Sequence, residues 1–139
     1  HCDSRRQRQM CIRDSPKYYP NKWGDHREAA KVIYDPNKVS FAELVKHVFN
    51  TVDYEDSDGQ FCDRGHSYSP AIYYKNNEQK NIINDIAPKT SKVAVEKETK
   101  FYPVRDEHQN FYKKNSLKYY LYKTACGREK RLKQLKKIK

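Results

Sequence analysis

The chain has 139 residues, a net charge of +11, 36% hydrophobic residues and a mean hydropathy of −1.18. This length argues for one domain, and the clustering of the apolar residues allows a small core, which argues against full disorder. No apolar run approaches the roughly 20 residues of a membrane span or resembles a signal-peptide core, and four glycines and six prolines exclude collagenous and low-complexity chains.

The positive charge is concentrated at one end of the chain. Residues 113–139 contain eleven Lys or Arg and one acid, a net +10, whereas residues 16–112 have a net charge of −1. A basic segment of this kind can contact nucleic acid, a membrane surface or an acidic protein, but it is more often a solvated helix face. We interpret it as a basic C-terminal helix.

Residues 1–15 differ from the rest of the chain. They show no apolar periodicity and no turn chemistry that leads into an element. The string RRQRQMCIRDS within them resembles translated adapter sequence, so we expect residues 1–15 to be a non-native extension. On this interpretation, residues 16–139 form a partial domain whose own N-terminus is missing.

The first fold-like elements are a strand and a helix. Ala29–Tyr34 has the composition of a strand and leads into the turn Asp35-Pro36-Asn37. Ser40 and Glu43 then form a capping box, which indicates a helix start. Apolar side chains follow at helical spacing and predict a helix that faces the core: Phe41, Leu44, Val45, Val48 and Phe49.

A long polar segment, residues 51–69, interrupts this pattern. It is rich in acids and contains two glycines, and a loop of this length in a compact domain is typical of a functional or disordered segment. Beyond it, the sequence predicts a strand at Ala71–Tyr74 and a helix at Asn77–Ala87 that ends at Pro88.

Three further elements complete the predicted fold. Lys92–Glu96 alternates polar and apolar residues, as a strand does, and a turn-like FYPV segment precedes a helix near Glu107–Asn115. A final helix runs from Arg128, with Leu132, Leu135 and Ile138 on one face. The β-α-β-α-β-α order predicts an α+β fold, a two-layer sandwich in which a small mixed sheet is covered by helices.

Three short clusters carry the residue types of a reactive site. They are Trp23–Glu28, Phe61–Tyr68 and Phe101–Gln109. Within the second cluster, Cys62 lies near His66, which suggests a cysteine nucleophile, although the acids of that loop oppose formation of a thiolate.

The cysteines and histidines do not indicate a disulfide framework or a metal site. The four cysteines, at positions 2, 11, 62 and 126, do not show the spacing of a disulfide framework. No metal is expected, because the usual ligand spacing is lacking among the candidate ligands His26, His66, His108 and Cys62.

Taken together, the clusters resemble the peptide methionine sulfoxide reductase A family. The likeness runs in order from about Pro16 to Leu135. Five motifs carry it: Pro16-Lys-Tyr18 as the P-x-Y turn of the family, the segment from Gly24 to Glu28 followed by AAKVIYDP, Ser40-Phe-Ala-Glu-Leu, GQFCDRGHSYSPAIYY, and the pair FYPVRDEHQNFYKKN and CGREKRLKQL. Each motif is weak by itself, but five in register over most of the chain are specific.

The resemblance implies an α+β enzyme that reduces methionine S-sulfoxide, free or peptide-bound, to methionine. In that reaction a cysteine thiolate attacks the sulfoxide sulfur, and the departing oxygen receives a proton from an acid or a phenol. The roles implied by position are Glu28 as the acid, Tyr18 (or the adjacent Tyr19) as one phenol donor, Asp63 as a carboxylate that orients water, Tyr68 as the second phenol, Cys126 as a resolving cysteine and His108 as a structural residue near the site.

One family motif is absent from the sequence. The nucleophile of the family lies in a GCFW motif that precedes the P-x-Y turn, and neither Cys2 nor Cys11 lies in such a motif. We therefore expect this polypeptide to lack the nucleophile and to be inactive as it stands, so that it is a reductase by family resemblance.

The resemblance also implies the partners. They are methionine sulfoxide and thioredoxin or a similar thiol reductant, with no cofactor. No membrane contact is expected, and the lack of a signal favours a cytoplasmic location. Two other functions stay open: a hydrolase built on Cys62 and His66, and a non-catalytic binding module that uses basic residues 113–139. For that module nucleic acid is disfavoured, because no aromatic stacking motif is present.

Overall fold

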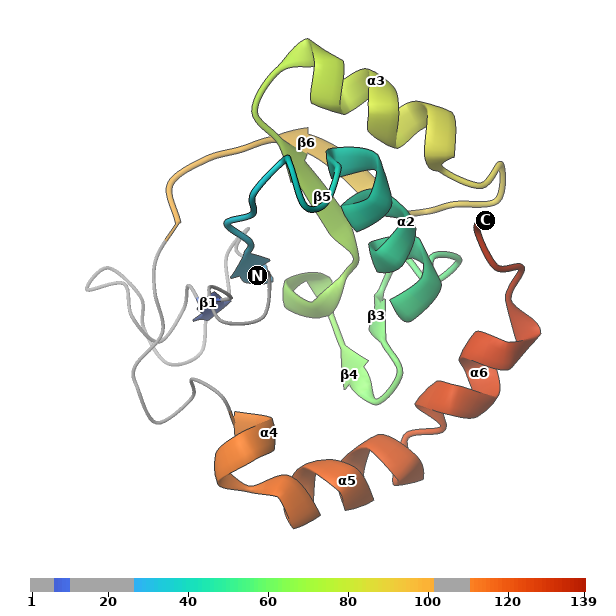
Figure 1. Ribbon diagram of the computed structural model, residues 1–139. Helices are drawn as coiled ribbons and strands as arrows, with labels where there is room; N and C mark the ends of the chain where they lie inside the picture. The colour runs from blue at the N-terminus through green and yellow to red at the C-terminus, as the bar shows by residue number, and fades with distance from the viewer. Residues whose placement is uncertain (1–6, 11–26, 102–110) are drawn as a thin grey trace.

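The computed structural model describes residues 7–10, 27–101 and 111–139. The strands are β1 (Gln7–Met10), β2 (Glu28–Lys31), β3 (Gly59–Gln60), β4 (Asp63–Arg64), β5 (Ala71–Tyr74) and β6 (Ala94–Lys97). The helices are α2 (Phe41–Thr51), the 3-10 turn η2 (His66–Tyr68), α3 (Asn77–Ile86), α4 (Phe111–Lys114), α5 (Ser116–Ala125) and α6 (Arg128–Gln134) (Figure 1). This mixture of strands and helices confirms the predicted α+β class.

The described strands pair as three two-stranded sheets. β1–β2 and β3–β4 are antiparallel, whereas β5–β6 is parallel, with Ala71 opposite Ala94 and Tyr74 opposite Lys97. A parallel pair requires a crossover connection, which here contains α3. Both kinds of pairing expected of a mixed sheet are therefore present, but they are distributed over three sheets instead of one.

β1 lies within residues 1–15, where the sequence predicts no element. It pairs with β2 from Gln7 opposite Lys31 to Met10 opposite Glu28. Such a ladder is made by backbone groups, so it requires no apolar pattern in the strand. The interpretation of residues 1–15 as a non-native extension stays a prediction.

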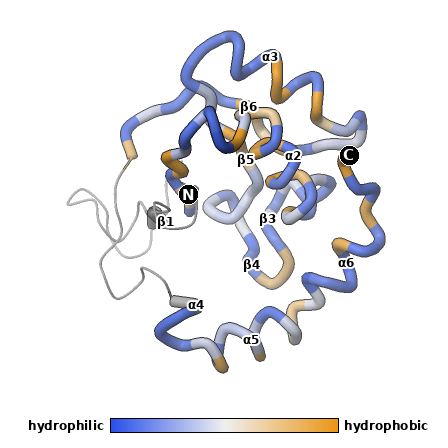
Figure 2. Tube along the Cα trace, in the orientation of Figure 1, coloured by the Kyte–Doolittle hydropathy of each residue, from blue (hydrophilic) through white to orange (hydrophobic). Residues whose placement is uncertain are grey.

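α2 begins where the capping box predicts. The Oγ of Ser40 accepts a hydrogen bond from the backbone N–H of Glu43 at 3.1 Å, and the apolar face places Val45 and Phe49 in the core. Hydrophobic stretches gather where α2, β5 and β6 lie together (Figure 2). The buried hydrophobic residues of the described chain are Val45, Phe49, Tyr54, Ile83, Val93 and Leu135.

The C-terminal segment returns to this core. Leu135 is buried, and Ile138 exchanges two backbone-to-side-chain hydrogen bonds with Asn50 at 2.7 and 2.9 Å. The Tyr54 hydroxyl donates to the carbonyl oxygen of Lys136 at 3.0 Å. The predicted final helix exists, but Leu135 and Ile138 lie beyond its end, in an extended segment that is fixed to the end of α2.

The basic segment 113–139, interpreted from the sequence as one C-terminal helix, contains α5 and α6 as separate helices. Within it, α5 packs differently from the helix predicted from Arg128. None of the residues of α5 is buried, and Leu117, Tyr120 and Leu121 are exposed. Its predecessor α4 lies within the helix predicted near Glu107–Asn115, of which residues 107–110 lie outside the described ranges.

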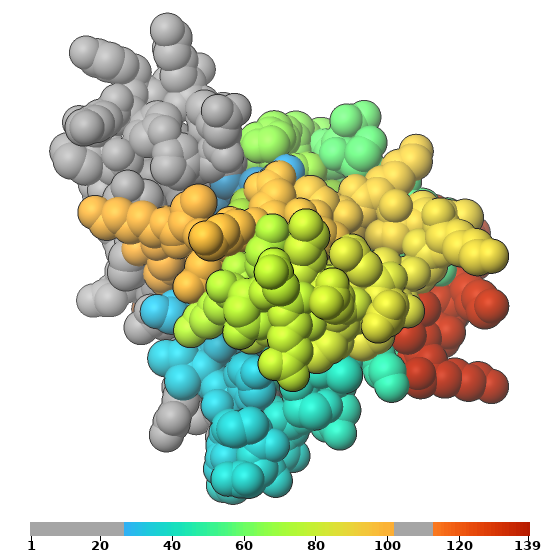
Figure 3. Space-filling model, turned by 90° about the horizontal axis from the view of Figure 1, so that it is seen from above, coloured from blue at the N-terminus to red at the C-terminus, as the bar shows by residue number. Residues whose placement is uncertain are grey.

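α3 and β6 cover the face of the molecule that is seen from above, with the C-terminal segment at its edge (Figure 3). Within the described ranges, no helix has the length and apolar character needed to cross a bilayer.

Candidate active site

A hollow of about 340 Å³ opens between β2, the β3–β4 hairpin and α5. Its lining includes four of the five site residues predicted from the sequence: Glu28, Asp63, Tyr68 and Cys126. They come from a strand, a hairpin, a 3-10 turn and the end of a helix, so the fold brings together residues up to 98 positions apart, from Glu28 to Cys126.

Three residues of the sequence-based site lie outside the described ranges. They are Tyr18, its alternative Tyr19 and His108. Their roles therefore stay predictions.

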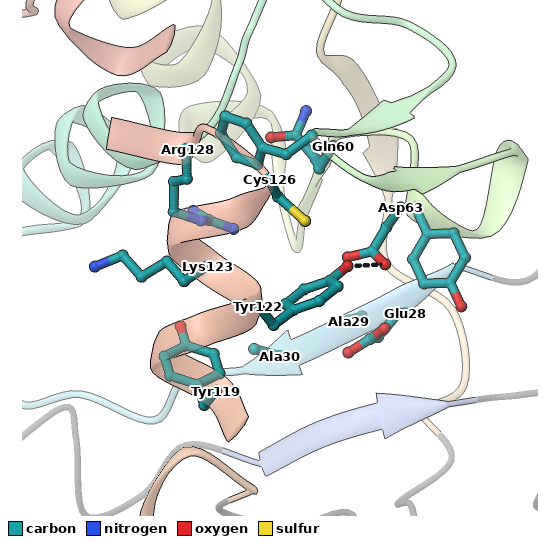
Figure 4. A pocket seen from close by; sticks show the side chains of 12 residues that line it. Glu28, Ala29, Ala30, Gln60, Asp63, Tyr119, Tyr122, Lys123, Cys126 and Arg128 are labelled. Carbon is teal, nitrogen blue, oxygen red and sulfur yellow. Dashed lines mark hydrogen bonds between the residues drawn. The ribbon is translucent and has the colours of Figure 1, made fainter. Parts of the chain in front are cut away.

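Glu28 is held in place by the residue before it. The guanidinium of Arg27 donates to the hydroxyl oxygen of Ser69 at 2.9 Å and, through Nη1, to the hydroxyl oxygen of Tyr73 and the carboxylate of Glu96, both at 3.0 Å. These bonds connect the start of β2 to the η2–β5 corner and to β6. These bonds anchor the residue next to Glu28, and the side chain of Glu28 lies in the lining of the hollow (Figure 4).

The β3–β4 hairpin positions Asp63. Gln60 and Asp63 are paired, so the turn between them consists of Phe61 and Cys62, and Phe61 takes a φ of 55°, a value that non-glycine residues seldom adopt. Gly59 is required by close approach, because a Cβ there would lie 2.2 Å from the carbonyl oxygen of Asp63.

Three consecutive residues of the β3–β4 hairpin each contact the C-terminal helical segment. The Arg128 guanidinium lies 4.4 Å from the centroid of the Phe61 ring, Cys62 forms a disulfide with Cys126 with a Cα–Cα distance of 5.3 Å, and Asp63 Oδ1 accepts a hydrogen bond from the Tyr122 hydroxyl. Because α5 has no buried residue, these links hold it over the hollow.

Tyr122 has a perturbed phenol, although the residue as a whole is 46% exposed. Partial burial raises the pKa of this phenol well above the ordinary value, and the hydrogen bond to Asp63 and the charges of Asp63, Tyr68 and Glu28 raise it further. The phenol is therefore neutral and donates to the carboxylate across the physiological range. Figure 4 shows Tyr122, Asp63 and Glu28 turned toward one another.

The acids of residues 51–69 have internal partners. Asp53 is buried, at 6% exposed, and its carboxylate accepts from Arg131 Nε at 2.7 Å, while Arg131 also pairs with Glu55 at 3.0 Å. Asp56 pairs with Arg64, whose hydrogen bonds hold the pKa of the Asp56 carboxyl below its usual value.

The basic tail is also partly used inside the protein. Arg128 donates to the carbonyl oxygen of Thr51 at 2.9 Å, Lys137 donates to that of Asn50, and Arg131 is paired as described above. The structure thus gives these basic residues a role in attaching α6, and nothing in the described part of the chain favours the binding module over the reductase.

Cys62 is not a free thiol in this structure. The disulfide with Cys126 means that the hypothesis of a Cys62–His66 nucleophile is wrong for this form of the chain. The pairing of Cys62 with Cys126, which are 64 positions apart, was not predicted from the sequence. Among the described residues no group of three or more His, Cys, Asp or Glu side chains could hold a metal ion.

Other lining residues were missed by the sequence analysis. They are Ala29, Ala30, Gln60, Phe61, Tyr119, Tyr122, Lys123 and Arg128. One signal does exist for Tyr122, because Tyr122 and Cys126 are four residues apart and so lie on the same face of a helix.

Hollows lined by acids and phenols are suited to donating protons to a bound oxygen. The comparisons with known proteins show the family of the chain. A family model described as peptide methionine sulfoxide reductase matches residues 11–139. The peptide methionine sulfoxide reductase MsrA 2 of Rhizobium meliloti is 40% identical over 130 residues, which are 87% of this chain and 65% of that protein. The MsrA 2 of Staphylococcus aureus is 38% identical over 84% of this chain and 72% of its own.

Solved structures show the same fold. Reduced Mxr1 of Saccharomyces cerevisiae aligns with a TM-score of 0.65 at 23% identity, over 81% of this chain and 70% of its own. Methionine sulfoxide reductase A of Corynebacterium diphtheriae aligns with a TM-score of 0.57 at 28% identity, over 67% and 53%. The chain belongs to the peptide methionine sulfoxide reductase family, and it spans 65% of the length of its Rhizobium meliloti relative.

Proposed function

We propose that the hollow binds the sulfoxide group of methionine S-sulfoxide and supplies the proton for its reduction. The observation that carries the proposal is that one hollow gathers Glu28, Asp63 and Tyr68, which are distant in sequence. The names of the relatives describe peptide methionine sulfoxide reductases, and their substrate is transferred to this chain as part of the proposal.

The reduction requires two kinds of group. A thiolate attacks the sulfoxide sulfur and forms an S–S bond, and protonation of the oxygen breaks the S–O bond so that the oxygen leaves as water. A water molecule then adds to the sulfur of the attacking cysteine, which breaks the S–S bond, releases methionine, leaves a sulfenic acid and returns one proton. In our proposal Glu28 delivers a proton to the departing oxygen, Tyr68 donates a hydrogen bond to the same oxygen, and Asp63 orients the water in the hollow. A second thiol then condenses with the sulfenic acid to give a disulfide and water.

Among the described residues that line the hollow, none has a free thiol that could attack the sulfoxide. Cys126 lines the hollow but is bonded to Cys62, and the sequence has no GCFW motif around Cys2 or Cys11. We therefore propose that the 139-residue polypeptide binds the sulfoxide without turning it over. Cys126 as a resolving cysteine, and thioredoxin or a related thiol protein as the reductant, belong to the same proposal.

Binding is tested by titrating the chain with N-acetylmethionine S-sulfoxide methylamide and following heat or amide shifts. Glu28→Gln keeps a hydrogen-bond donor at this position, so its affinity should stay close to that of the unmodified chain. Glu28→Ala removes the donor and should bind about tenfold more weakly. The exposed Glu43→Gln on α2 is the matched control and should behave as the unmodified chain.

Turnover is tested separately with dithiothreitol as reductant. We expect no methionine above the level of dithiothreitol alone. Activity that disappears in Cys62→Ser or Cys126→Ser would show that the reduced pair supplies the nucleophile, which would overturn the proposal of an inactive polypeptide while leaving the binding site intact.

A further inference from the structure

We propose that Tyr122 is a positioning residue of the sulfoxide site, which fixes one oxygen of the Asp63 carboxylate so that the other serves the hollow. This inference rests on the proposed function. Tyr122 comes from α5, within the segment interpreted from the sequence as a basic helix, and no sequence motif assigns it a role.

The hydrogen bond between Tyr122 and Asp63 has a defined direction. The Tyr122 hydroxyl donates to Oδ1 of Asp63. A carboxylate attached to a two-residue strand can rotate about its side-chain bonds, and a charge-assisted hydrogen bond is the stronger kind. Since Oδ1 is engaged by the phenol, Oδ2 is the oxygen left to order a water or a substrate group.

The phenol of Tyr122 lies among the other groups of the site. Tyr122 lines the same hollow as Glu28 and Tyr68, and its oxygen lies within electrostatic reach of both. A phenol at this point can hold the carboxylate without adding a charge to the hollow. Lysine would also hold Asp63, but its positive charge would compete with Glu28 for the proton-donor role.

Tyr122 is itself held in place by the neighbouring disulfide. Its helix has no buried residue, but Cys126, one turn further along the same face, is bonded to Cys62, the neighbour of Asp63. The disulfide and the hydrogen bond are thus adjacent links between two short segments. The covalent link limits the distance that Tyr122 can move from Asp63.

The test is a double-mutant cycle on binding of N-acetylmethionine S-sulfoxide methylamide by the intact chain. Tyr122→Phe keeps the ring and removes the hydroxyl, and we expect affinity to fall about tenfold, the effect of one hydrogen bond to a charged group. In the Asp63→Asn background the same change should alter affinity less than about twofold, because the role of the phenol depends on the carboxylate. Tyr120→Phe, on the exposed side of α5, is the matched control and should bind as the unmodified chain.

The outcomes separate this inference from the proposed function. If the unmodified chain binds and Tyr122→Phe binds equally well, the inference is overturned alone. Equal losses in both backgrounds would show a general effect on packing and would also overturn it. If the unmodified chain binds no sulfoxide, the proposed function fails and the inference fails with it.

Discussion

Cys62 and Cys126 join the turn of the β3–β4 hairpin to the end of α5, across 64 positions of the chain. Closing a loop of this length removes conformational freedom from the unfolded chain, which typically stabilises a protein by about 2–4 kcal/mol. The Cys62→Ser/Cys126→Ser double variant should lower the free energy of unfolding by about this amount. Urea denaturation followed by circular dichroism measures it.

A reductant provides the control for the disulfide prediction. Dithiothreitol should lower the urea midpoint of the unmodified chain and leave that of the double serine variant unchanged. An identical midpoint for the oxidised and reduced forms would contradict a stabilising role for the disulfide.

Gly59 should tolerate no side chain. Because a Cβ would lie 2.2 Å from the carbonyl oxygen of Asp63, Gly59→Ala should push the two hairpin strands apart and cost more than about 2 kcal/mol. Gly127, with a φ of 68° and open space around it, is the matched comparison, and Gly127→Ala should cost about 1 kcal/mol through backbone strain. Urea denaturation of both variants checks the order, and equal losses would argue against the close approach in the hairpin.

The buried carboxylate of Asp53 should depend on Arg131. Arg131→Met removes the charged donor of Asp53, which is only 6% exposed. The expected decrease in the free energy of unfolding is about 1–3 kcal/mol. Lys130→Met removes the same charge from the exposed neighbouring position and should change stability by less than about 0.5 kcal/mol. The thermal midpoints of the two variants measure the difference; the prediction fails if the two are alike.

The phenol of Tyr122 should titrate above the ordinary tyrosine pKa near 10, because of its burial and of the carboxylate beside it. A group whose pKa is raised by folding stabilises the protein below its unfolded pKa, and this contribution is lost as the pH rises through its folded pKa. The Tyr122 contribution is therefore constant at neutral pH and decreases in strong alkali. Asp63→Asn should lower the pKa of Tyr122 toward the ordinary value.

Carbon-13 NMR of Cζ-labelled tyrosine measures this titration, with Tyr122→Phe to assign the resonance. A Tyr122 signal that titrates as free tyrosine does, or that is insensitive to Asp63→Asn, would contradict the hydrogen bond between the two side chains.

Much of the fold could be predicted because local chemistry marks it. The capping box at Ser40 and the apolar face after it correctly place α2, and the strand Ala71–Tyr74 has the predicted bounds. α5 was not separated from the rest of the basic segment 113–139, which was interpreted as one helix. Its large apolar residues Leu117, Tyr120 and Leu121 stay exposed, and none of its residues is buried, so the helix does not belong to the core that the apolar pattern was used to locate. The pairing of the short strands depends on the path of the whole chain and could not be read from any one segment.

Some residues of the candidate site could be predicted from the sequence, and others could not. Glu28, Asp63 and Tyr68 could be proposed from motifs, because each lies in a segment with its own pattern. Tyr122 lies in an ordinary stretch of a basic tail and acquires its role through contact with Asp63, from which it is separated by 59 positions. The Cys62–Cys126 bond likewise depends on tertiary structure.

The measurement that tests the central claim most directly is the pair of dissociation constants of this chain for the S and R epimers of N-acetylmethionine sulfoxide methylamide. If Glu28 and Tyr68 direct donors at one oxygen of a chiral sulfur, the S epimer should bind at least about tenfold more tightly than the R epimer, which corresponds to about 1.4 kcal/mol. The Glu28→Ala variant should lose that preference. Equal affinity for both epimers, or a preference that survives removal of Glu28, would contradict the account.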